Sequence, residues 1–428
     1  MTERSAGRRI LFVTNTIPGE EIGATKRAAA HLQALCSLGD VDLVLIGGHD
    51  EASLPGDLRR QFGTVVVEPV REEAARWKAY GAMSGRLAKT KALLFDLFPP
   101  ELHSLSDPEA EASAARLPAC RYDVVFAFKI QAISWVHQVL ASKAAPTIPV
   151  RIGDFDDLTS DYRAKLGAQA GHGSLMRLID QVHVARIRRV ERQVLKSWDL
   201  TIVCSETDSD RAMALGVAHR EPLVVPNGVT MAPPCEPTGV WPADRPIRLL
   251  FIGLLNYKPN VDALHWLAND ILPALDEQMP RPFVVDVVGR RDTGEVEGLC
   301  RQHPALNFLG EADSLQPVYE SAAAAIVPLR LGSGTRLKIL EAFQFGRAVI
   351  STHKGAEGLS VTDGEHILLA DTAGKFAAAV RRIAEDDALR AALETAGRER
   401  LLALYTREAI VAEQVKALGS LMQKANAI

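Results

Sequence analysis

Short, continuous apolar runs recur along this sequence, and many of them are followed by a loop and then by a stretch with helical periodicity. Runs without polar alternation are typical of strands buried on both faces of a parallel sheet. In the first half they fall at residues 9–13, 41–46, 64–67, 123–128, 147–152, 200–203 and 223–225. In the second half they fall at 249–253, 283–289, 307–309, 324–328 and 348–351. The pattern predicts the α/β class with doubly wound sheets, which bind ligands beyond the carboxyl ends of their strands.

A stiff connector separates the two halves. The turn signal Asn227–Gly228 is followed by prolines at 233, 234, 237 and 242 before the next apolar run begins. With 428 residues, the chain is longer than a single hydrophobic core usually serves. We therefore expect two Rossmann-like domains facing a cleft, residues 1–226 and residues 227–405. The last helical stretch, 406–428, is expected to pack back on the N-terminal domain.

Composition narrows the classes of protein that this chain can belong to. The net charge of −4 argues against a general nucleic-acid-binding protein. The five cysteines lie far apart, with no CxxC spacing, so neither a zinc site nor a disulfide framework is indicated. No apolar stretch approaches the roughly 20 residues that span a bilayer. We expect a cytoplasmic protein.

Two basic segments interrupt the regular alternation of the first half. Residues 71–97 interleave arginines and lysines with aromatic and aliphatic side chains. This segment is either a surface that contacts the inner face of a membrane reversibly, or a helical hairpin with a solvated face. Residues 175–197 are expected to form a long basic helix whose arginines are mainly solvated.

The stretch Gly332–Ala342 carries the strongest chemical signal in the second half. It follows an apolar run, and its glycines open a helix where free backbone N–H groups favour an anion. Arg336 and Lys338 fall in the first turns of this helix, and Glu341 lies one turn further on. A nucleoside diphosphate needs this combination, because cations meet its phosphates and a carboxylate accepts hydrogen bonds from its ribose. The alternative is a strand–turn–helix with a charged helix face.

Three carboxylates, Asp154, Asp156 and Asp157, follow directly after the run that ends at residue 152. They are expected to accept hydrogen bonds from sugar hydroxyls or to bind a cation, because close carboxylates repel one another. The alternative is a surface turn with N-cap aspartates. Near the first strand, Gly23 and Arg27 open a helix and are candidates for the acceptor or phosphate side of a site.

Four motifs in the second half occur in a specific order. They are Asn227–Val229, Phe251–Gly253, the stretch from Pro328 to Ala342, and Gly355–Leu359. In this order they resemble the C-terminal half of retaining glycosyltransferases with the GT-B fold. The GSGTRLKILEA stretch, Tyr257–Pro259–Asn260 and a DFxDxxS stretch resemble a subgroup that often serves bacterial polysaccharide assembly. The resemblance is strong over residues 245–365 and weaker over the first half.

The resemblance implies sugar transfer from a nucleoside diphosphate sugar to a glycan or lipid-linked acceptor, with retention of anomeric configuration. Arg336, Lys338, Asp154 and Asp157 are then the candidate catalytic residues. Donor-binding candidates are Gly253, Lys258, Asn260, Ser333, Gly334, Thr335, Glu341, Glu357 and Gly358. Neither a cofactor nor a metal ion is expected, because cations of the protein neutralise the diphosphate.

The sequence also departs from the wider family at three points. The family has two glutamates separated by seven residues; the second matches Glu341, but Ser333 occupies the first position. Leu254 stands where many members have an arginine, and the His–Asp loop of the family is not evident. Two alternatives therefore stay open: an inactive GT-B-like partner subunit, and a hydrolase or epimerase that acts on a nucleotide sugar.

Overall fold

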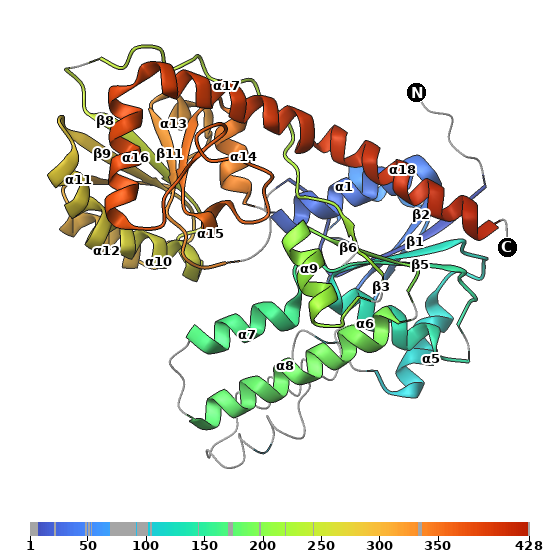
Figure 1. Ribbon diagram of the computed structural model, residues 1–428. Helices are drawn as coiled ribbons and strands as arrows, with labels where there is room; N and C mark the ends of the chain where they lie inside the picture. The colour runs from blue at the N-terminus through green and yellow to red at the C-terminus, as the bar shows by residue number, and fades with distance from the viewer. Residues whose placement is uncertain are drawn as a thin grey trace. The chain divides into compact units, whose positions relative to one another are not determined.

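The computed structural model describes residues 7–426 apart from 21–22, 48, 50–51, 53, 69–90, 92–101, 103–104, 144, 170–173, 197, 219, 243 and 333–335. The chain divides into two compact units (Figure 1). Unit 1 comprises Met1–Pro226 and Ile410–Ile428, and unit 2 comprises Asn227–Ala409. The basic segment 71–97 lies outside the described residues except for position 91, so its expected role stays a prediction.

Unit 1 is built on a seven-stranded parallel sheet with the order β3-β2-β1-β4-β5-β6-β7. Its strands are β1 (Arg9–Thr14), β2 (Asp40–Leu45), β3 (Val65–Val67), β4 (Val124–Phe128), β5 (Val150–Asp154), β6 (Leu200–Val203) and β7 (Leu223–Val224). Its helices are α1 (Gly23–Leu38), α2 (Gly56–Arg59), α5 (Asp107–Arg116), α6 (Lys129–Leu140), α7 (Thr159–Gln169), α8 (Ser174–Leu195), α9 (Glu206–Ala214) and most of α18 (Arg407–Asn426).

Unit 2 is built on a six-stranded parallel sheet with the order β10-β9-β8-β11-β12-β13. Its strands are β8 (Ile247–Ile252), β9 (Phe283–Val288), β10 (Leu306–Gly310), β11 (Ala324–Val327), β12 (Ala348–Ser351) and β13 (Leu368–Leu369). Its helical segments are α10 (Lys258–Trp266), η3 (Leu267–Ile271), α11 (Leu272–Gln278), α12 (Glu295–Gln302), α13 (Gln316–Glu320), α14 (Leu337–Gln344), α15 (His353–Ala356), α16 (Ala373–Glu385) and α17 (Asp387–Leu404).

Burial on both faces explains why the strands read as continuous apolar runs. In β1, Ile10 and Phe12 belong to the hydrophobic cluster on one face of the sheet. Leu11 and Val13 belong to the cluster on the other face. Successive side chains of a strand point to opposite faces, so a strand covered on both sides has few polar positions.

The two sheets share one topology. In each, the first strand lies between the second and the fourth strand of its unit, so the chain direction reverses beside the first strand. This reversal lies between β1 and β4 in unit 1, and between β8 and β11 in unit 2. Loops diverge there and leave room for a ligand at the carboxyl edge of the sheet. The prediction of two doubly wound α/β units is confirmed.

Helix α18 covers unit 1 beside α1 (Figure 1). Ile410, Leu418 and Met422 of α18 share a buried cluster with Leu32 and Leu35 of α1. Within the described residues, none of the helices is both long and apolar enough to cross a bilayer.

Candidate functional site

The loop after β8 packs closely on the first turn of α10. A Cβ atom on Gly253 would lie 2.5 Å from Nδ2 of Asn260, so only glycine fits this position. The Asn260 Nδ2 group donates a hydrogen bond to the Leu254 carbonyl at 2.9 Å. Pro259 sits in the first helical turn, where no partner is needed for an N–H group. Asn260 is thereby fixed at the carboxyl edge of the sheet of unit 2.

Lys338 reaches this loop from α14. Its Nζ donates a hydrogen bond to Oδ1 of Asn260 at 2.7 Å and lies 4.8 Å from the centroid of the Phe251 ring. Burial, with the nearby charge of Arg336, lowers the pKa of Lys338 to about 7, against an opposing effect of Glu341. A lysine with this pKa gains its full charge when an anion binds beside it.

Arg336 lies immediately before α14 and is buried. Its Nη2 donates a hydrogen bond to the Lys354 carbonyl at 3.2 Å and lies 3.6 Å from Oε2 of Glu357. Gly332 has φ of +116°, and a Cβ atom there would lie 2.9 Å from Nη1 of Arg336. Arg336 therefore ties the loop before α14 to the loop after β12, and its contact with a diphosphate stays a prediction.

The loop after β12 is compact. Thr352 caps α15 by accepting a hydrogen bond from the Gly355 N–H group at 2.7 Å. A Cβ atom on Gly355 would lie 2.3 Å from Oγ of Ser351 and 2.7 Å from the Val327 carbonyl, so the glycine permits this packing. Gly358 has φ of +85°, which also favours glycine.

Glu357 is partly buried and forms an ion pair with Nζ of Lys354. Its carboxylate is therefore shared between Lys354 and Arg336. Sequence reasoning did not single out Lys354, because a lone lysine in a short helix carries no distinctive signal.

Of the remaining donor-binding candidates, the structure describes only Glu341 and Lys258. Glu341 is partly buried on α14, one turn beyond Lys338. Lys258 is exposed at the first position of α10. Ser333, Gly334 and Thr335 lie outside the described residues, so their expected role stays a prediction.

Unit 1 holds a buried charge network at the carboxyl end of β5. Asp154 accepts hydrogen bonds from Nε and Nη2 of Arg27, the latter at 2.7 Å, and Nε2 of His31 lies 2.8 Å from its Oδ2. The Nη1 group of Arg27 donates to the Val225 carbonyl at 2.6 Å, and Nδ1 of His31 lies 2.7 Å from Oε1 of Gln414. The network joins α1, β5, the end of β7 and α18.

In this network Asp154 and Arg27 are engaged with each other. Both residues are buried, with Asp154 at 0% exposure, and each is occupied by the other. Although burial acts to raise it, the pKa of Asp154 falls to about 2 because Arg27 and His31 stabilise the carboxylate. The pair therefore stabilises unit 1, and a contact of either residue with a substrate stays a prediction. Gly23 is the first residue of α1, which carries Arg27.

Two residues with left-handed backbones lie at the same edge of the sheet. Lys129, directly after β4, has φ of +74°, and Asp156, just after β5, has φ of +59°. Nζ of Lys129 lies 3.6 Å from Oδ2 of Asp156, and both side chains are partly exposed. Non-glycine residues with positive φ are strained and cluster at functional sites. Asp157, the residue after Asp156 in the sequence, is also partly buried.

Lys129 was missed by sequence reasoning, since nothing in a lysine after an apolar run reveals its backbone angle.

The backbone strain at Lys129 leads to a testable prediction. Lys129→Gly is expected to have a free energy of unfolding about 1 kcal/mol higher than Lys129→Ala, because both lose the ammonium group but only glycine relieves the strain. Urea denaturation measures the difference, and equal stabilities would show that the left-handed backbone costs nothing.

In the described parts of the chain, no group of three or more His, Cys, Asp or Glu side chains is arranged to hold a metal ion.

Comparisons with solved structures define the class of fold. The chain resembles sucrose-phosphate synthase from Thermosynechococcus elongatus with a TM-score of 0.65 and 19% identity, covering 98% of this chain and 100% of that chain. It also resembles the lipopolysaccharide outer core galactosyltransferase WaaB, with a TM-score of 0.61, 11% identity and coverage of 96% and 99%. Anabaena Alr3699/HepE in complex with UDP and glucose gives a TM-score of 0.61, 13% identity and coverage of 97% and 100%. The chain has the GT-B fold of glycosyltransferases.

Sequence comparison adds a family signature in unit 2. Residues 246–386 match the family model described as glycosyl transferases group 1. An uncharacterized 44.6 kDa protein in the cps region of Klebsiella pneumoniae is 28% identical over 137 residues. That match spans 30% of this chain and 35% of the curated relative. The residues that match the family model lie within unit 2.

Proposed function

We propose that this protein transfers a sugar from a nucleoside diphosphate sugar to a hydroxyl group of an acceptor, with retention of anomeric configuration. The observation that carries the proposal is the placement of Lys338, a cation held by Asn260 beside Phe251, at the carboxyl edge of the unit 2 sheet. This sheet lies within the residues that match the family model of group 1 glycosyl transferases. Such an edge, where loops diverge at a topological switch point, is the expected place for a nucleotide in a doubly wound fold.

The proposed reaction places each charge where the unit 2 site can stabilise it. The acceptor oxygen attacks the anomeric carbon on the face from which the diphosphate departs, and the bond from that carbon to the phosphate oxygen breaks. The proton of the acceptor hydroxyl passes to the departing phosphate oxygen. Negative charge grows on the diphosphate, where Lys338 stabilises it, and Glu341 accepts hydrogen bonds from the ribose.

The same mechanism needs no protein nucleophile, and we propose that it needs no metal ion because Lys338 and Arg336 together stabilise the charge of the diphosphate. Uridine diphosphate is the first nucleotide to test, because Alr3699/HepE is described in complexes with UDP and with UDP-glucose. We place the transfer in polysaccharide assembly, with a glycan or lipid-linked acceptor, on the strength of the motif order and the likeness to WaaB. Reversible contact with the inner face of a membrane through residues 71–97 belongs to the same proposal.

A screen of nucleoside diphosphates by thermal shift tests donor binding. A ligand that binds only the native state raises the melting temperature, by an amount that grows with its concentration over Kd. Incubation of the matching sugar nucleotide with and without acceptor sugars then separates the candidate functions. Transfer product supports the proposal, whereas free sugar without acceptor indicates a hydrolase, an altered sugar an epimerase, and binding without turnover a partner subunit.

The affinity for UDP is expected to fall with rising pH above 7. Because the pKa of Lys338 is about 7 in the free protein, its charged form is abundant below that pH and becomes scarce above it. Bound diphosphate retains the charged form, so the association constant should fall by up to about tenfold per pH unit between pH 8 and 9.

Calorimetric titrations at pH 7, 8 and 9 measure this slope, since the phosphates of UDP are about nine-tenths or more ionised throughout that range. Lys338→Met is the control, because it removes the titrating group, and its affinity should be low at every pH. A wild-type affinity that stays constant from pH 7 to 9 would place Lys338 outside the diphosphate site.

A further inference from the structure

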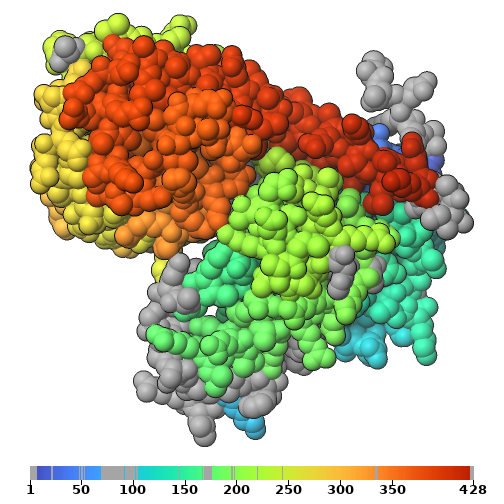
Figure 2. All heavy atoms as spheres, in the orientation of Figure 1, coloured from blue at the N-terminus to red at the C-terminus, as the bar shows by residue number. Residues whose placement is uncertain are grey.

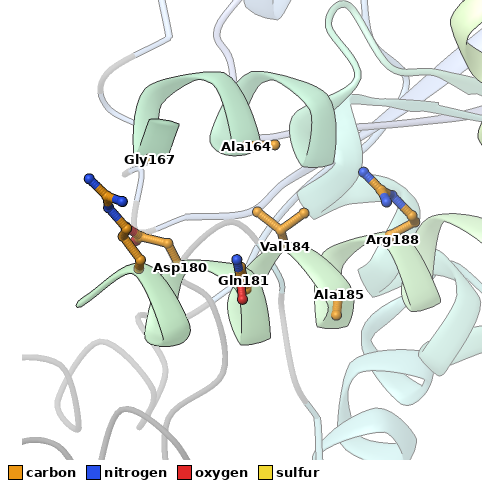
Figure 3. A pocket seen from close by; sticks show the side chains of 8 residues that line it. Ala164, Gly167, Asp180, Gln181, Val184, Ala185 and Arg188 are labelled. Atoms are coloured by element: carbon orange, nitrogen blue, oxygen red, sulfur yellow. The ribbon is translucent and has the colours of Figure 1, made fainter. Parts of the chain in front are cut away.

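A pocket of about 510 Å³ lies between α7 and α8 of unit 1, apart from the residues assigned to sugar transfer (Figure 3). Its volume falls within the roughly 300–1,000 Å³ of small-molecule sites. Small or apolar side chains line much of it: Ala164 from α7, and Val184 and Ala185 from α8. In Figure 3 the Val184 side chain points from α8 towards α7. A ligand in this pocket would meet an apolar wall along the helix pair.

Polar side chains lie at the two ends of the row of α8 residues that line the pocket. Figure 3 shows Asp180 and Arg188 at opposite ends, on the same side of α8 as Val184. At the Asp180 end the two helices approach closely, because a Cβ atom on Gly167 would lie 3.3 Å from Oδ2 of Asp180. The Asp180 carboxylate is therefore held against the backbone of α7. Space for a ligand head group is expected at the Arg188 end.

Arg188 offers a cation to such a head group. Its Nε atom is enclosed, and no described residue accepts a hydrogen bond from it. A buried N–H donor without an acceptor is costly, and an anion would supply the acceptor that Nε lacks, although the charge of Arg188 also interacts with the buried Glu191 carboxylate. The fixed fork of arginine suits a phosphate group, which can accept two parallel hydrogen bonds.

The surrounding surface has the same mixture of positive charge and apolar side chains. Helix α8 carries five arginines and two acidic residues, and one of the latter, Glu191, is buried. Next to the pocket residue Arg177, Met176 is 42% exposed and Leu178 is 49% exposed. Figure 2 shows α7 and α8, in green, at the surface of unit 1. An anionic molecule with an apolar chain matches this surface as well as the pocket.

We propose that the pocket between α7 and α8 binds an amphiphile with a phosphate head group. The phosphate is placed against Arg188, and the apolar chain follows Ala164 and Val184. This inference does not depend on the proposed sugar transfer, because none of the pocket residues belongs to the unit 2 site. A phosphate amphiphile can come from a membrane lipid or from a soluble phosphorylated metabolite.

Binding of n-decyl phosphate to the full-length protein, below its micelle concentration, tests the pocket directly. Calorimetry is expected to show saturable binding of one molecule per chain. Inorganic phosphate lacks the chain, and decyl maltoside lacks the charge, so both should bind at least tenfold more weakly. Absence of saturable decyl phosphate binding overturns the proposal.

Three variants locate the binding site. Arg188→Gln is expected to weaken decyl phosphate binding at least tenfold, and Ala164→Phe should abolish it by filling the pocket. Arg189→Gln is the matched control, because it removes one charge from the next, exposed position of the same helix outside the pocket. Melting temperatures confirm that each variant is folded. Unchanged affinity in both pocket variants overturns the proposal.

Vesicles of phosphatidylcholine with 30% phosphatidylglycerol distinguish the two sources. Vesicle binding that Arg188→Gln removes, and that decyl phosphate competes away, identifies a membrane lipid as the ligand. Decyl phosphate binding without vesicle binding identifies a soluble amphiphile. Both outcomes support the pocket. Vesicle binding that Arg188→Gln and Arg189→Gln reduce equally, without competition by decyl phosphate, shows only a basic surface and overturns the proposal.

Discussion

Lys338→Met is expected to lower kcat for sugar transfer about a hundredfold. The ammonium group is proposed to meet charge that grows on the diphosphate as the donor bond breaks, and loss of such a group costs on the order of 3 kcal/mol of transition-state stabilisation. Methionine keeps the length of the apolar stem beside Phe251. Steady-state kinetics with the donor identified by the nucleotide screen measure the change.

The stability of this variant separates catalysis from folding. Burial of the Lys338 ammonium lowers its pKa, so the charged form is disfavoured in the folded protein, and its removal should leave the melting temperature within a few degrees. Lys375→Met is the matched control, because this lysine is exposed on α16 of the same unit. A kcat within threefold of wild type in a folded Lys338→Met protein would falsify the assignment.

Glu341→Gln should change a different kinetic constant. The ribose contact exists both before and during transfer, so its loss weakens donor binding and raises KM while kcat changes little. The contrast between the two variants distinguishes a group that stabilises the departing diphosphate from one that holds the nucleotide throughout.

The fold was predictable because it depends on local patterns. Each strand of a doubly wound sheet is buried on both faces, so runs such as 9–13 identify strands without knowledge of their neighbours. The order of strands and helices then restricts the topology, because parallel crossovers are right-handed. Strand β13, the pair Leu368–Leu369, escaped prediction.

The side-chain partners of the candidate site were less predictable. Lys338 and Asn260 are separated by 78 positions in the sequence, and only the folded sheet brings them together. The sequence marked both residues through their motifs, but it did not show that they bond to each other. The network in unit 1 is less visible still, because Arg27 and Asp154 are 127 positions apart and Gln414 comes from the last helix.

The same distance in sequence explains why the partners of Asp154 were not predicted. Three neighbouring carboxylates suggest a ligand site when their partners are unknown, since their repulsion needs a reason. In the structure Arg27 and His31 provide that reason for Asp154, whereas Asp156 lies beside Lys129 at the exposed edge. A charge that looks free in the sequence can be neutralised by a distant segment.

Arg27→Met is expected to lower the free energy of unfolding of unit 1 by about 3–5 kcal/mol. The substitution removes the guanidinium from the carboxylate of Asp154, which has no exposure to solvent, and leaves the His31 imidazole beside it. Breaking a buried pair costs much more than the pair contributes, because the remaining charge is desolvated without compensation. Urea unfolding followed by circular dichroism measures the loss.

The double variant Arg27→Met with Asp154→Leu is the control. It removes both charges, so it should recover at least half of the stability that the single variant loses. A single variant that loses less than about 1 kcal/mol, or a double variant that loses more than the single one, would contradict the structural role assigned to the pair.

The dependence on pH follows from the same network. The pKa of Asp154 is about 2 in the folded protein, below its ordinary value of 3.8, so the folded state binds fewer protons than the unfolded state between these values. The stabilisation is therefore fully present above about pH 4 and is lost as the pH falls towards 2. Wild-type stability should decline over this interval more steeply than that of the double variant, which has no carboxylate at position 154. Parallel slopes in the two proteins would mean that the acid sensitivity of unit 1 arises from other carboxylates.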